Sequence, residues 1–444
     1  MATQAQHAQP GDLVEVKAFE GLNCADERMI DGLQRTAFDY FLQHTHPRTG
    51  LVADTSRPGA PASIAVVGFA LSTYPVAVER GWIARGVAVQ RCLDALRFFA
   101  DSDQSGAVDA TGWRGFYFHF LDAETGLRAW KSELSSIDTA LLVIGMLTAA
   151  AYFDAAAPVE SELRQLAQAL YDRVNWNWSE HDDDAVALGW KPECGFLNYG
   201  WQGYSEAIVL YALGLGSTTH RLTAASFEAW TLTYQWENLY GIDYLYAGPL
   251  FMHQFSHAWI DLRGIRDTFM REKDCDYFEN SRRAAQVQRQ YAIRNPHGFP
   301  GYGQDGWGLT AGDGPSVAPR MVAGHRQAFY GYAARGAPWG PDDGTRNGAC
   351  VAASLVFAPE IALPALRQLV ATSGPGARAV HASGFNVTAG AGTAWISEGE
   401  YGLDQGLMVL MIENFRSGLL WRLTRKIPCL RVGLARAGFT GGWL

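Results

Sequence analysis

Apolar residues recur at helical spacing along most of this chain. In the segment Glu27–His44, the side chains of Ile30, Leu33 and Phe41 can share one face of a helix, and a loop containing Pro47 follows it. The same spacing predicts further helices over Ser63–Arg80, Ala84–Ala100, Ile137–Phe153, Val159–Val174, Ser205–Leu215, Ala224–Glu237, Phe255–Phe269, Asp276–Arg294, His325–Ala334, Ala352–Phe357, Pro359–Thr372 and Asp404–Ser417. The chain is therefore predicted to be mostly α-helical, with about a dozen helices.

Strand-like patterns are scarce. Gly115–Leu121 and Leu127–Lys131 flank the turn-like sequence DAETG and predict one β-hairpin. Short strands are also predicted within Arg378–Ile396. Long loops rich in Gly and aromatic residues occupy Pro296–Pro315 and Pro338–Gly348, and loops of this length inside a compact domain are usually functional.

Many helices with functional loops between them predict helix pairs that close into an α/α toroid, with a pocket at one mouth. A helical solenoid is the competing architecture. Solenoids show a sequence repeat of about 30 to 45 residues, and this chain has none. We therefore expect a closed all-α barrel.

The composition fits a folded chain with a neutral ligand. Of the 444 residues, 48% are hydrophobic and 18% are charged, so a large core is available. The formal net charge of -9 argues against nucleic acid, which is bound mainly through Lys and Arg. The 15 Trp residues exceed the usual need of a core; some could stack on sugar faces, although most are expected to be core anchors.

The cysteines and the N-terminus give further expectations. The six cysteines show no Cys-x-x-Cys spacing, so we expect free, mainly buried thiols rather than zinc or redox chemistry. No signal-peptide pattern is visible at the start, which predicts either a cytoplasmic protein or one whose signal has been removed. The apolar run Ala140–Phe153 is too short to cross a bilayer, so no membrane anchor is expected.

Carboxylic acids near helix starts are the best candidates for chemistry, because glycoside hydrolysis usually needs one carboxylic acid as proton donor and a second as nucleophile or base. In Trp130–Thr139, Glu133 precedes a predicted helix and Asp138 lies in or near its first turn. For Asp138, helix capping and catalysis are equally good interpretations. Glu133 also fits a plain surface charge.

A second acid, Glu206, ends the aromatic loop Gly195–Ala207 and leads directly into an apolar helix; Trp201 lies in the same loop. Glu206 is either a charge at a helix N-terminus or a carboxyl held against hydrophobic walls. The latter environment raises the pKa of a carboxyl, as a general acid requires.

The loop Pro296–Pro315 surrounds Asp305 and Asp313 with glycines and with the rings of Tyr302 and Trp307. Its backbone could approach a ligand closely while the rings stack on it. A calcium loop is the rival, but the acids are too few and wrongly spaced for an EF-hand. We expect replacing Trp307 by Ala to weaken ligand binding more than folding.

A last acidic cluster precedes the final long predicted helix. Within Trp395–Gly406 the chain offers Trp395, Glu400 and Asp404 beside one another. Asp404 could simply cap that helix. Three acids among seven residues, Glu398 included, would be unusual for a plain connector.

Metal and cofactor motifs are incomplete. His253 and His257 have the spacing of a helical zinc pair, but the sequence HQFSH lacks the glutamate of HExxH. The two histidines could instead hydrogen-bond sugar hydroxyls or stabilise the fold. We therefore predict no metal and no cofactor.

Several of these segments together resemble the glucoamylase-like (glycoamylase-like) domain family, which includes glycoside hydrolase family 144, the bacterial endo-β-1,2-glucanases. The motifs are ELSSIDTALL, FLNYGWQGYSEA, HQFSHAWIDLRG, NSRRAAQVQRQYAIRNP, YGQDGWGLTAGDGP, LDQGLMVLMIENF and GFTGGWL. The resemblance covers the chain from about Glu27 onward. It implies an N-terminal extension over 1–26 and one catalytic (α/α)6 barrel over 27–444.

The resemblance also implies metal-independent hydrolysis of β-1,2-glucan with inversion. It makes Glu206 the general acid, Asp404 a base or water-orienting group, and Glu133 and Asp138 the matches of the ELSSID acids. The residues expected to bind substrate are Asp54, Trp201, His253, His257, Tyr302, Asp305, Trp307, Asp313, Trp395 and Glu400.

Alternatives remain on the same scaffold: a transglycosylase, an exo-acting glucosidase, an enzyme for another glucan linkage, or a glucan-binding protein without turnover. In each case the expected partner is a neutral glucan or oligosaccharide, and we expect a monomer that binds neither nucleic acid nor membrane. Family members commonly work in the periplasm or outside the cell, so we expect that location if a signal was removed and the cytoplasm otherwise.

Overall fold

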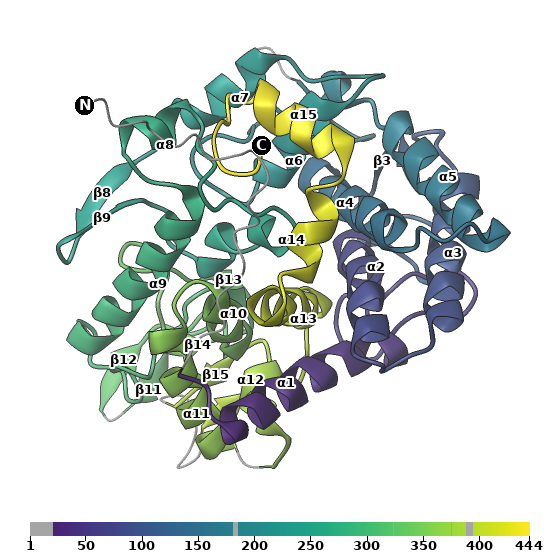
Figure 1. The fold of residues 1–444 in the computed structure, drawn as a ribbon. Helices are drawn as coiled ribbons and strands as arrows, with labels where there is room; N and C mark the ends of the chain where they lie inside the picture. The colour runs from purple at the N-terminus through teal and green to yellow at the C-terminus, as the bar shows by residue number, and fades with distance from the viewer. Residues whose placement is uncertain (1–20, 181–184, 323, 374, 388–393) are drawn as a thin grey trace, which may run out of the picture.

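The computed structural model describes residues 21–180, 185–322, 324–373, 375–387 and 394–444. Helices dominate it (Figure 1). The α-helices are α1 Cys24–Gln43, α2 Ile64–Glu79, α3 Arg85–Asp101, α4 Ser136–Tyr152, α5 Pro158–Arg173, α6 Ile208–Gly216, α7 Ala224–Thr231, α8 Thr268–Glu272, α9 Tyr277–Arg294, α10 Gly348–Ala353, α11 Pro359–Ser373, α12 Arg378–His381, α13 Gly402–Arg416, α14 Leu419–Thr424 and α15 Pro428–Arg436. The 3-10 turns are η1 Trp176–Ser179, η2 Leu250–His253, η3 Ser256–Ala258, η4 Ser354–Val356 and η5 Pro375–Ala377.

The strands are short and form small antiparallel sheets. They are β1 Ala62–Ser63, β2 Gly112–Trp113, β3 Phe116–Tyr117, β4 Phe120–Leu121, β5 Leu134–Ser135, β6 Gly189–Lys191, β7 Gly195–Phe196, β8 Trp236–Leu239, β9 Ile242–Leu245, β10 Ala311–Gly312, β11 Arg320–Val322, β12 His325–Gln327, β13 Ala333–Ala334, β14 Thr345–Arg346, β15 Phe385–Asn386 and β16 Trp395–Ile396. They pair as β1-β4, β2-β3, β5-β6-β7, β8-β9, β10-β13, β11-β12 and β14-β15-β16. The prediction of a mostly helical chain is thus confirmed.

The inner helices are apolar on all sides because other helices cover both of their faces. In α2 almost every residue is buried, whereas α1 and α9 each bury only one stripe. Helix α2 packs against α4 and α13, α4 packs against α6, and α13 packs against α10. In Figure 1, α13 and α10 lie near the centre, with α3 and α5 at the right-hand edge. One continuous apolar core links nearly all of these helices.

Glycines set the closest helix contacts. A Cβ atom at Gly68 of α2 would lie 2.1 Å from the carbonyl oxygen of Leu141 on α4, and a Cβ at Gly145 of α4 would lie 2.1 Å from the carbonyl oxygen of Gly68. Between α6 and α15, a Cβ at Gly433 would lie 1.8 Å from the carbonyl oxygen of Ala212. These helices can pack backbone to backbone only because the side chains are missing there.

Three predicted helices are wrong in whole or in part. The segment Phe255–Phe269 forms the short turn η3 and the start of α8, because its buried polar groups bond to other elements instead of to their own helix. The segment His325–Ala334 contains β12 and β13. The helix from Ala224 stops at Thr231, and β8 and β9 form a hairpin around Tyr240 and Gly241, both at positive φ.

Smaller differences concern the remaining elements. The predicted helix Ala352–Phe357 lies earlier, as α10 and η4, and α14 and α15 were not predicted. The predicted hairpin of Gly115–Leu121 with Leu127–Lys131 is reduced to one bridge between Leu121 and Arg128, because β3 pairs with β2 and β4 with β1. The strands predicted within Arg378–Ile396 are present as β15 and β16.

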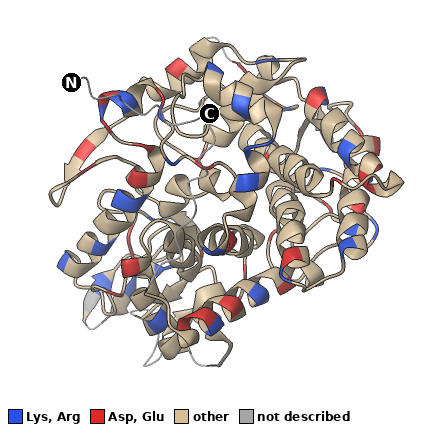
Figure 2. Ribbon diagram, viewed as in Figure 1, with Lys and Arg blue, Asp and Glu red and all other residues tan. Residues whose placement is uncertain are grey.

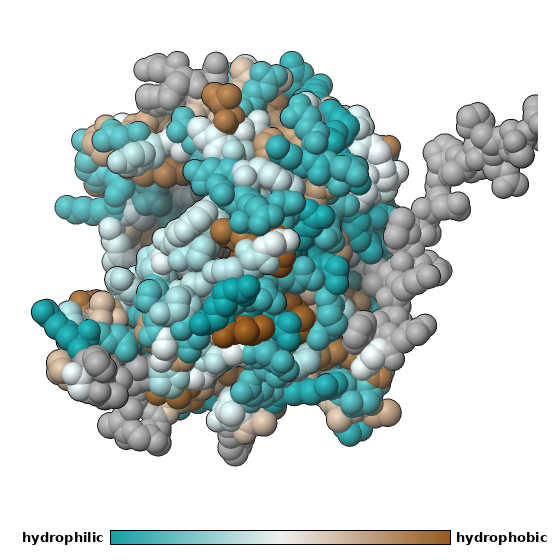
Figure 3. All heavy atoms as spheres, turned by 90° about the vertical axis from the view of Figure 1, so that its left-hand side faces the viewer, coloured by the Kyte–Doolittle hydropathy of each residue, from teal (hydrophilic) through white to brown (hydrophobic). Residues whose placement is uncertain are grey.

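The surface carries both charge signs. Figure 2 shows Lys and Arg interspersed with Asp and Glu along the outer helices. The face in Figure 3 is largely hydrophilic, with apolar residues in small separate patches. All six cysteines are free, as predicted, although only Cys92, Cys275 and Cys350 are buried. Among the described residues, no helix combines the length and apolar character needed to cross a bilayer. Residues 1–20 of the predicted extension lie outside the described part.

Candidate functional site

A cavity of about 720 Å³ lies where the N-terminal ends of α4, α13 and the chain entering α6 converge. Its volume is that of a typical small-molecule pocket. Its polar lining consists of Asp54, Thr55, Arg57, His119, Asp138, Glu206, Thr310, Tyr332, Cys350, Ser383, Tyr401 and Asp404. Three of the four acids predicted to be catalytic therefore border one cavity, and Glu133 lies just behind it.

Glu206 lies in the turn before α6 and is buried, with 9% of its surface exposed. Its Oε2 atom has no hydrogen-bond partner among the residues that the structure describes. Burial raises the pKa of this carboxyl to about 7, with a smaller contribution from Asp138. The backbone here is fixed by Ser256, whose hydroxyl donates to the Glu206 carbonyl oxygen at 2.6 Å and accepts from the Val209 amide at 3.2 Å. Glu206 is thus a carboxyl on a fixed backbone, and a substantial fraction of it is protonated near neutral pH.

Asp404 lies in the first turn of α13. Burial raises its pKa to about 7, although hydrogen bonds from Asn347 and Ser383 oppose the rise. The Asn347 amide nitrogen donates to Asp404 Oδ2 at 2.9 Å, while the Asn347 side-chain oxygen caps α10 by accepting from the backbone of Ala349 and Cys350. Asp404 is therefore oriented by donors, in contrast to Glu206.

His119 on the segment before β4 joins the acids of the ELSSID motif. Its Nδ1 atom lies 3.0 Å from Glu133 Oε1 and 3.6 Å from Asp138 Oδ2. Ser135 is the residue that caps α4: its hydroxyl accepts from the Asp138 amide and donates to the Asp138 carboxylate, so Asp138 supports the cap from the first turn of the helix while it borders the cavity. Burial alone would lower the pKa of His119, but Asp138 and Glu133 outweigh this effect and raise the pKa to about 9.

The same three residues could be considered as metal ligands, because each offers a ligand atom and these atoms lie within 4.8 Å of one another. Metal binding, however, requires a neutral imidazole. The raised pKa of His119 keeps it protonated at neutral pH, with Nδ1 donating to Glu133. The cluster is therefore better described as an ion pair of an imidazolium with two carboxylates.

A loop over residues 54–60 forms another part of the wall. The Asp54 carbonyl accepts from the Gly402 amide at 2.8 Å, and Thr55 forms a β-bridge with Tyr401, so the loop is attached to the start of α13. Burial raises the pKa of the Asp54 carboxyl to about 6. The Arg57 guanidinium, at the cavity, forms an ion pair with Asp313.

Asp313 does not line the cavity but bonds residues that form its wall. Besides Arg57, it accepts from the Tyr401 hydroxyl at 2.8 Å and from the Ser397 hydroxyl at 2.6 Å. The predicted substrate-binding role of Asp313 is therefore replaced by a supporting position behind Arg57 and Tyr401.

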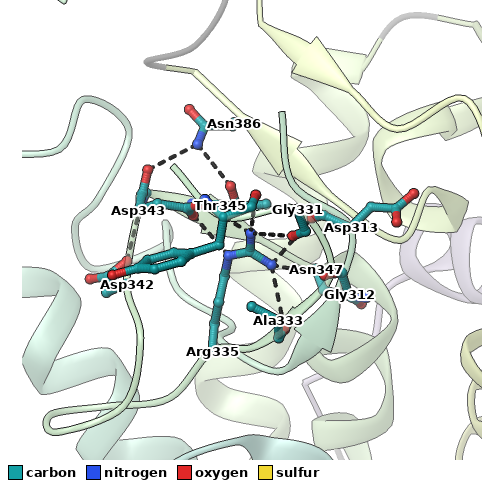
Figure 4. Close-up of polar contacts among 12 residues, drawn as sticks. Gly312, Asp313, Gly331, Ala333, Arg335, Asp342, Asp343, Thr345, Asn347 and Asn386 are labelled. Atoms are coloured by element: carbon teal, nitrogen blue, oxygen red, sulfur yellow. Dashed lines mark hydrogen bonds and ion pairs between the residues drawn. The ribbon is translucent and has the colours of Figure 1, made fainter. Parts of the chain in front are cut away.

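A buried ion pair fixes the loop that carries Asp313. Arg335 is 1% exposed, and its Nε and Nη2 atoms donate to the Asp343 carboxylate at 2.8 and 2.9 Å. The guanidinium also donates to the carbonyl oxygens of Gly312 and Gly331, at 2.9 and 3.1 Å (Figure 4). The Asp313 carboxylate points away from Arg335 in this view. Asn386 adds a bond to the Asp343 carbonyl oxygen at 3.0 Å.

Aromatic rings cover other parts of the cavity wall. These are Phe120, Trp130, Phe251, Phe255, Tyr332 and Tyr401. Trp130 and Tyr332 are largely exposed, at 69% and 63%. Rings of this kind can stack on a flat, neutral ligand.

Trp201, His253 and His257, predicted to bind substrate, do not line the cavity; the histidines are buried and Trp201 is half-buried. The Trp201 indole donates to the Ser136 hydroxyl at 2.9 Å and packs against the core. His253 and His257 are buried, and burial lowers their pKa values to about 4 and about 3. His253 contacts the Ala247 carbonyl oxygen and His257 contacts the Ser281 hydroxyl. The possibility that these histidines stabilise the fold is the one that fits.

The Pro296–Pro315 loop contributes Thr310 and Ala311 to the cavity lining, but its predicted binding residues lie elsewhere. Trp307 is only 3% exposed and belongs to the core, which corrects the prediction that its ring serves binding more than folding. Asp305 lies beside Trp307 at a separate, very small space, and the Tyr302 hydroxyl donates to Asp342 at 2.6 Å. The glycines let this loop fold inward, so its rings pack instead of pointing outward.

Trp395 and Glu400 also lie outside the cavity lining. Trp395 belongs to β16, and the Glu400 amide donates to the Ser56 hydroxyl at 3.0 Å, which ties the chain before α13 to the Asp54 loop. Burial raises the pKa of the Glu400 carboxyl.

Sequence reasoning missed His119, Arg57 and Tyr332. His119 lies within a predicted strand, where its side chain gives no periodic signal, and Arg57 lies in a loop far along the chain from Asp313. The composition of GFYFHFL could have singled out His119 as the one imidazole in a segment of aromatic and apolar residues.

Chemically, the cavity offers two carboxyls with pKa values near 7, Glu206 and Asp404, together with the cationic groups of His119 and Arg57. One carboxyl can donate a proton while the other accepts one, which is the requirement for acid/base catalysis near neutral pH.

Part of the chain matches a known protein family. Residues 198–428, just over half of the 444 residues, match the family model "Glycoamylase: Putative glucoamylase". A curated relative, the exo β-1,2-glucooligosaccharide sophorohydrolase (non-reducing end) of Parabacteroides distasonis, is 26% identical over 93% of this chain. The chain spans 58% of that relative's length.

Solved structures share the fold. A protein described as a "putative glucoamylase" from Bacteroides uniformis has a TM-score of 0.83 and 28% identity, over 95% of this chain and 100% of that one. A β-1,2-glucanase from Parabacteroides distasonis has a TM-score of 0.81 and 25% identity, over 93% of this chain and 60% of that one.

Proposed function

Because this chain belongs to the glycoamylase family, we propose that it is a glycoside hydrolase that cleaves β-1,2-glucan or sophoro-oligosaccharides by acid/base catalysis. The substrate class is supported by the names of two relatives, a sophorohydrolase and a β-1,2-glucanase, at 26% and 25% identity. A neutral substrate is also consistent with a cavity that combines aromatic rings with a balance of acids and cations.

The observation that carries the proposal is the state of Glu206. Its side chain lines the cavity, and one of its two carboxyl oxygens is buried without a hydrogen-bond partner among the described residues, so no described protein group holds that oxygen. Because its pKa is raised to about 7, Glu206 can protonate the oxygen of the leaving sugar. We therefore assign Glu206 as the general acid.

Asp404 is proposed as the base or the water-orienting group. Hydrogen bonds from Asn347 and Ser383 orient its carboxylate at the cavity wall, where it can meet a water molecule. In an inverting enzyme the two carboxyl groups are expected roughly 6.5 to 9.5 Å apart, or farther if a relay intervenes. Asp138 and Glu133 are proposed to support the acid pair through His119.

For the architecture we propose an (α/α)6 barrel, formed as one catalytic domain over residues 27–444. The mutual packing of α10, α13, α2, α4 and α6 supports an inner ring, and η2 with η3 would stand where a regular sixth inner helix is expected.

A panel of linkage-defined glucans, with products identified by mass spectrometry, tests the proposed activity. We expect release of short β-1,2-linked oligosaccharides from linear β-1,2-glucan, with NMR showing an inverted anomeric configuration in the first product. Preference for laminarin, cellulose or starch would overturn the substrate assignment. Binding of β-1,2-glucan without any product at high enzyme concentration would instead indicate a binding protein.

A further inference from the structure

Two consecutive residues at the edge of the cavity have an unusual backbone. Trp130 and Lys131 have φ values of 54° and 50°, in the left-handed region. The turn closes with a hydrogen bond from the Ser132 amide to the Ala129 carbonyl oxygen at 3.1 Å. Positive φ at both central positions is the pattern of a type I′ turn, which strongly favours Gly, Asn or Asp. Tryptophan is therefore a poor choice for this position on conformational grounds alone.

The Trp130 side chain offers little folding benefit in return. Its surface is 69% exposed, and its ring lines the cavity. Its ring contacts that of Phe120, at 5.0 Å between centroids and 56° between planes, and Phe120 in turn stacks on His119 at 3.9 Å. A strained backbone that presents an exposed ring to a cavity is the kind of feature that is retained for function rather than for stability.

We propose that Trp130 is a sugar-stacking residue at the rim of the cavity, and that it binds a glucosyl unit beyond those next to Glu206. The inference rests on the function proposed above and adds a subsite to it. The rim position follows from the contrast between the exposed Trp130 ring and the buried Glu206 carboxyl. The indole presents a broad flat face of the kind that stacks against the apolar face of a pyranose ring.

The position predicts a dependence on chain length. We expect a β-1,2-linked disaccharide held at the buried acids to stop short of the rim, and a longer oligosaccharide to extend to Trp130. Loss of the ring should therefore weaken the binding of long ligands and leave the binding of the disaccharide nearly unchanged.

Isothermal titration calorimetry on an otherwise inactive Glu206→Gln protein tests this, with sophorose and a longer linear β-1,2-gluco-oligosaccharide as probes. Adding Trp130→Gly should weaken binding of the longer probe by roughly tenfold, and Trp130→Phe should recover part of it. Lys131→Gly is the matched control, because it relieves the strain of a positive φ at the adjacent residue and keeps the Trp130 ring. We expect Lys131→Gly to bind both probes like the parent, and neither glycine variant to have a lower Tm than the parent.

The outcomes distinguish a failure of the rim subsite from a failure of the proposed function. If the parent binds neither probe, the proposed function fails. If the parent binds the longer probe and Trp130→Gly binds it equally well, the rim subsite fails while the function stands. A Tm that falls in Trp130→Gly but not in Lys131→Gly would assign the ring to folding and also overturn the inference.

Discussion

The chain entering α6 and the first turn of α13 bring a carboxyl to the same cavity in different ways. At α6, Glu206 has an unpartnered oxygen, and only its backbone is held, by Ser256. At α13, Asp404 accepts a hydrogen bond from Asn347 on its side chain. Burial is the main cause of a pKa near 7 in both. The difference teaches that similar acidity can serve two tasks: an unbonded carboxyl is free to transfer a proton, and a bonded one is fixed to direct a water molecule.

The largest effect on turnover should come from removing the ionisable group of Glu206 or of Asp404. Glu206→Gln and Asp404→Asn keep size and most hydrogen bonds but remove the transferable proton and the base. We expect turnover of β-1,2-glucan to fall by about 10² to 10⁴ in each variant while the fold survives. Initial rates of reducing-sugar release, with circular dichroism as the folding check, measure this. Near-normal turnover in Glu206→Gln would move the general acid to Asp138 or Glu133.

The next effect concerns stability and comes from the cost of ionising the buried Glu206 carboxyl in the folded state. Because the pKa of Glu206 is about 7 in the folded state against an ordinary 4.5, the folded state favours the protonated form. This contribution is fully present below about pH 4.5 and is lost as the pH rises toward about 7. Glu206→Gln should therefore be more stable than the parent near pH 8, by on the order of 3 kcal/mol, and equally stable near pH 4.

Denaturant titrations at the two pH values measure that difference. The exposed Glu398→Gln is the matched control and should show no pH-dependent gain. A Glu206→Gln protein that gains no stability near pH 8 would mean that the carboxyl is solvated in the folded state.

A third prediction concerns a second carboxyl placed next to Asp404. Asn347→Asp retains an oxygen that can cap α10 but replaces the amide donor facing Asp404 with a second carboxyl. Two carboxyls in contact share a proton, so the base is protonated up to a higher pH. We expect kcat/KM near pH 7 to drop by about tenfold, with the acidic limb of the pH profile shifted upward and Tm little changed. An unshifted limb with lowered activity would reduce Asn347 to a helix cap.

The smallest effect is expected from chelation. Because His119 is protonated at neutral pH and bonded to Glu133, we expect EDTA to leave the turnover of β-1,2-glucan unchanged. Loss of activity in EDTA with recovery on adding zinc would make His119, Glu133 and Asp138 metal ligands. Calcium rescue should be tested in parallel.

Local patterns identified the acids well. An acid directly before an apolar helical run is visible in sequence, and Glu206, Asp404 and Asp138 all border the cavity. Their partners were not visible, because Arg57 meets Asp313, and Asn347 meets Asp404, only through contacts between distant segments. Sequence indicated which carboxyls to consider but not what orients them.

Loops and short elements were predicted less well than long helices. The periodicity of α1 to α5 predicted those helices nearly to their ends. In Phe255–Phe269 the apolar spacing is equally helical, yet the Ser256 hydroxyl bonds the start of α6 and Asp261 pairs with Arg263 and Arg425. Trp307 shows the opposite problem, since glycine neighbours suggested exposure while they allowed burial. Both errors come from tertiary contacts that no local window contains.

The buried Arg335–Asp343 pair has a consequence for how quickly a ligand can be accepted. It ties the carbonyl oxygens of Gly312 and Gly331 into one unit, so the wall behind Arg57 and Tyr401 is already formed before anything enters. A wall that needs no ordering on association loses little conformational entropy there. We therefore expect this side of the cavity to behave as a rigid template, with the arrival of substrate limited by encounter rather than by loop closure.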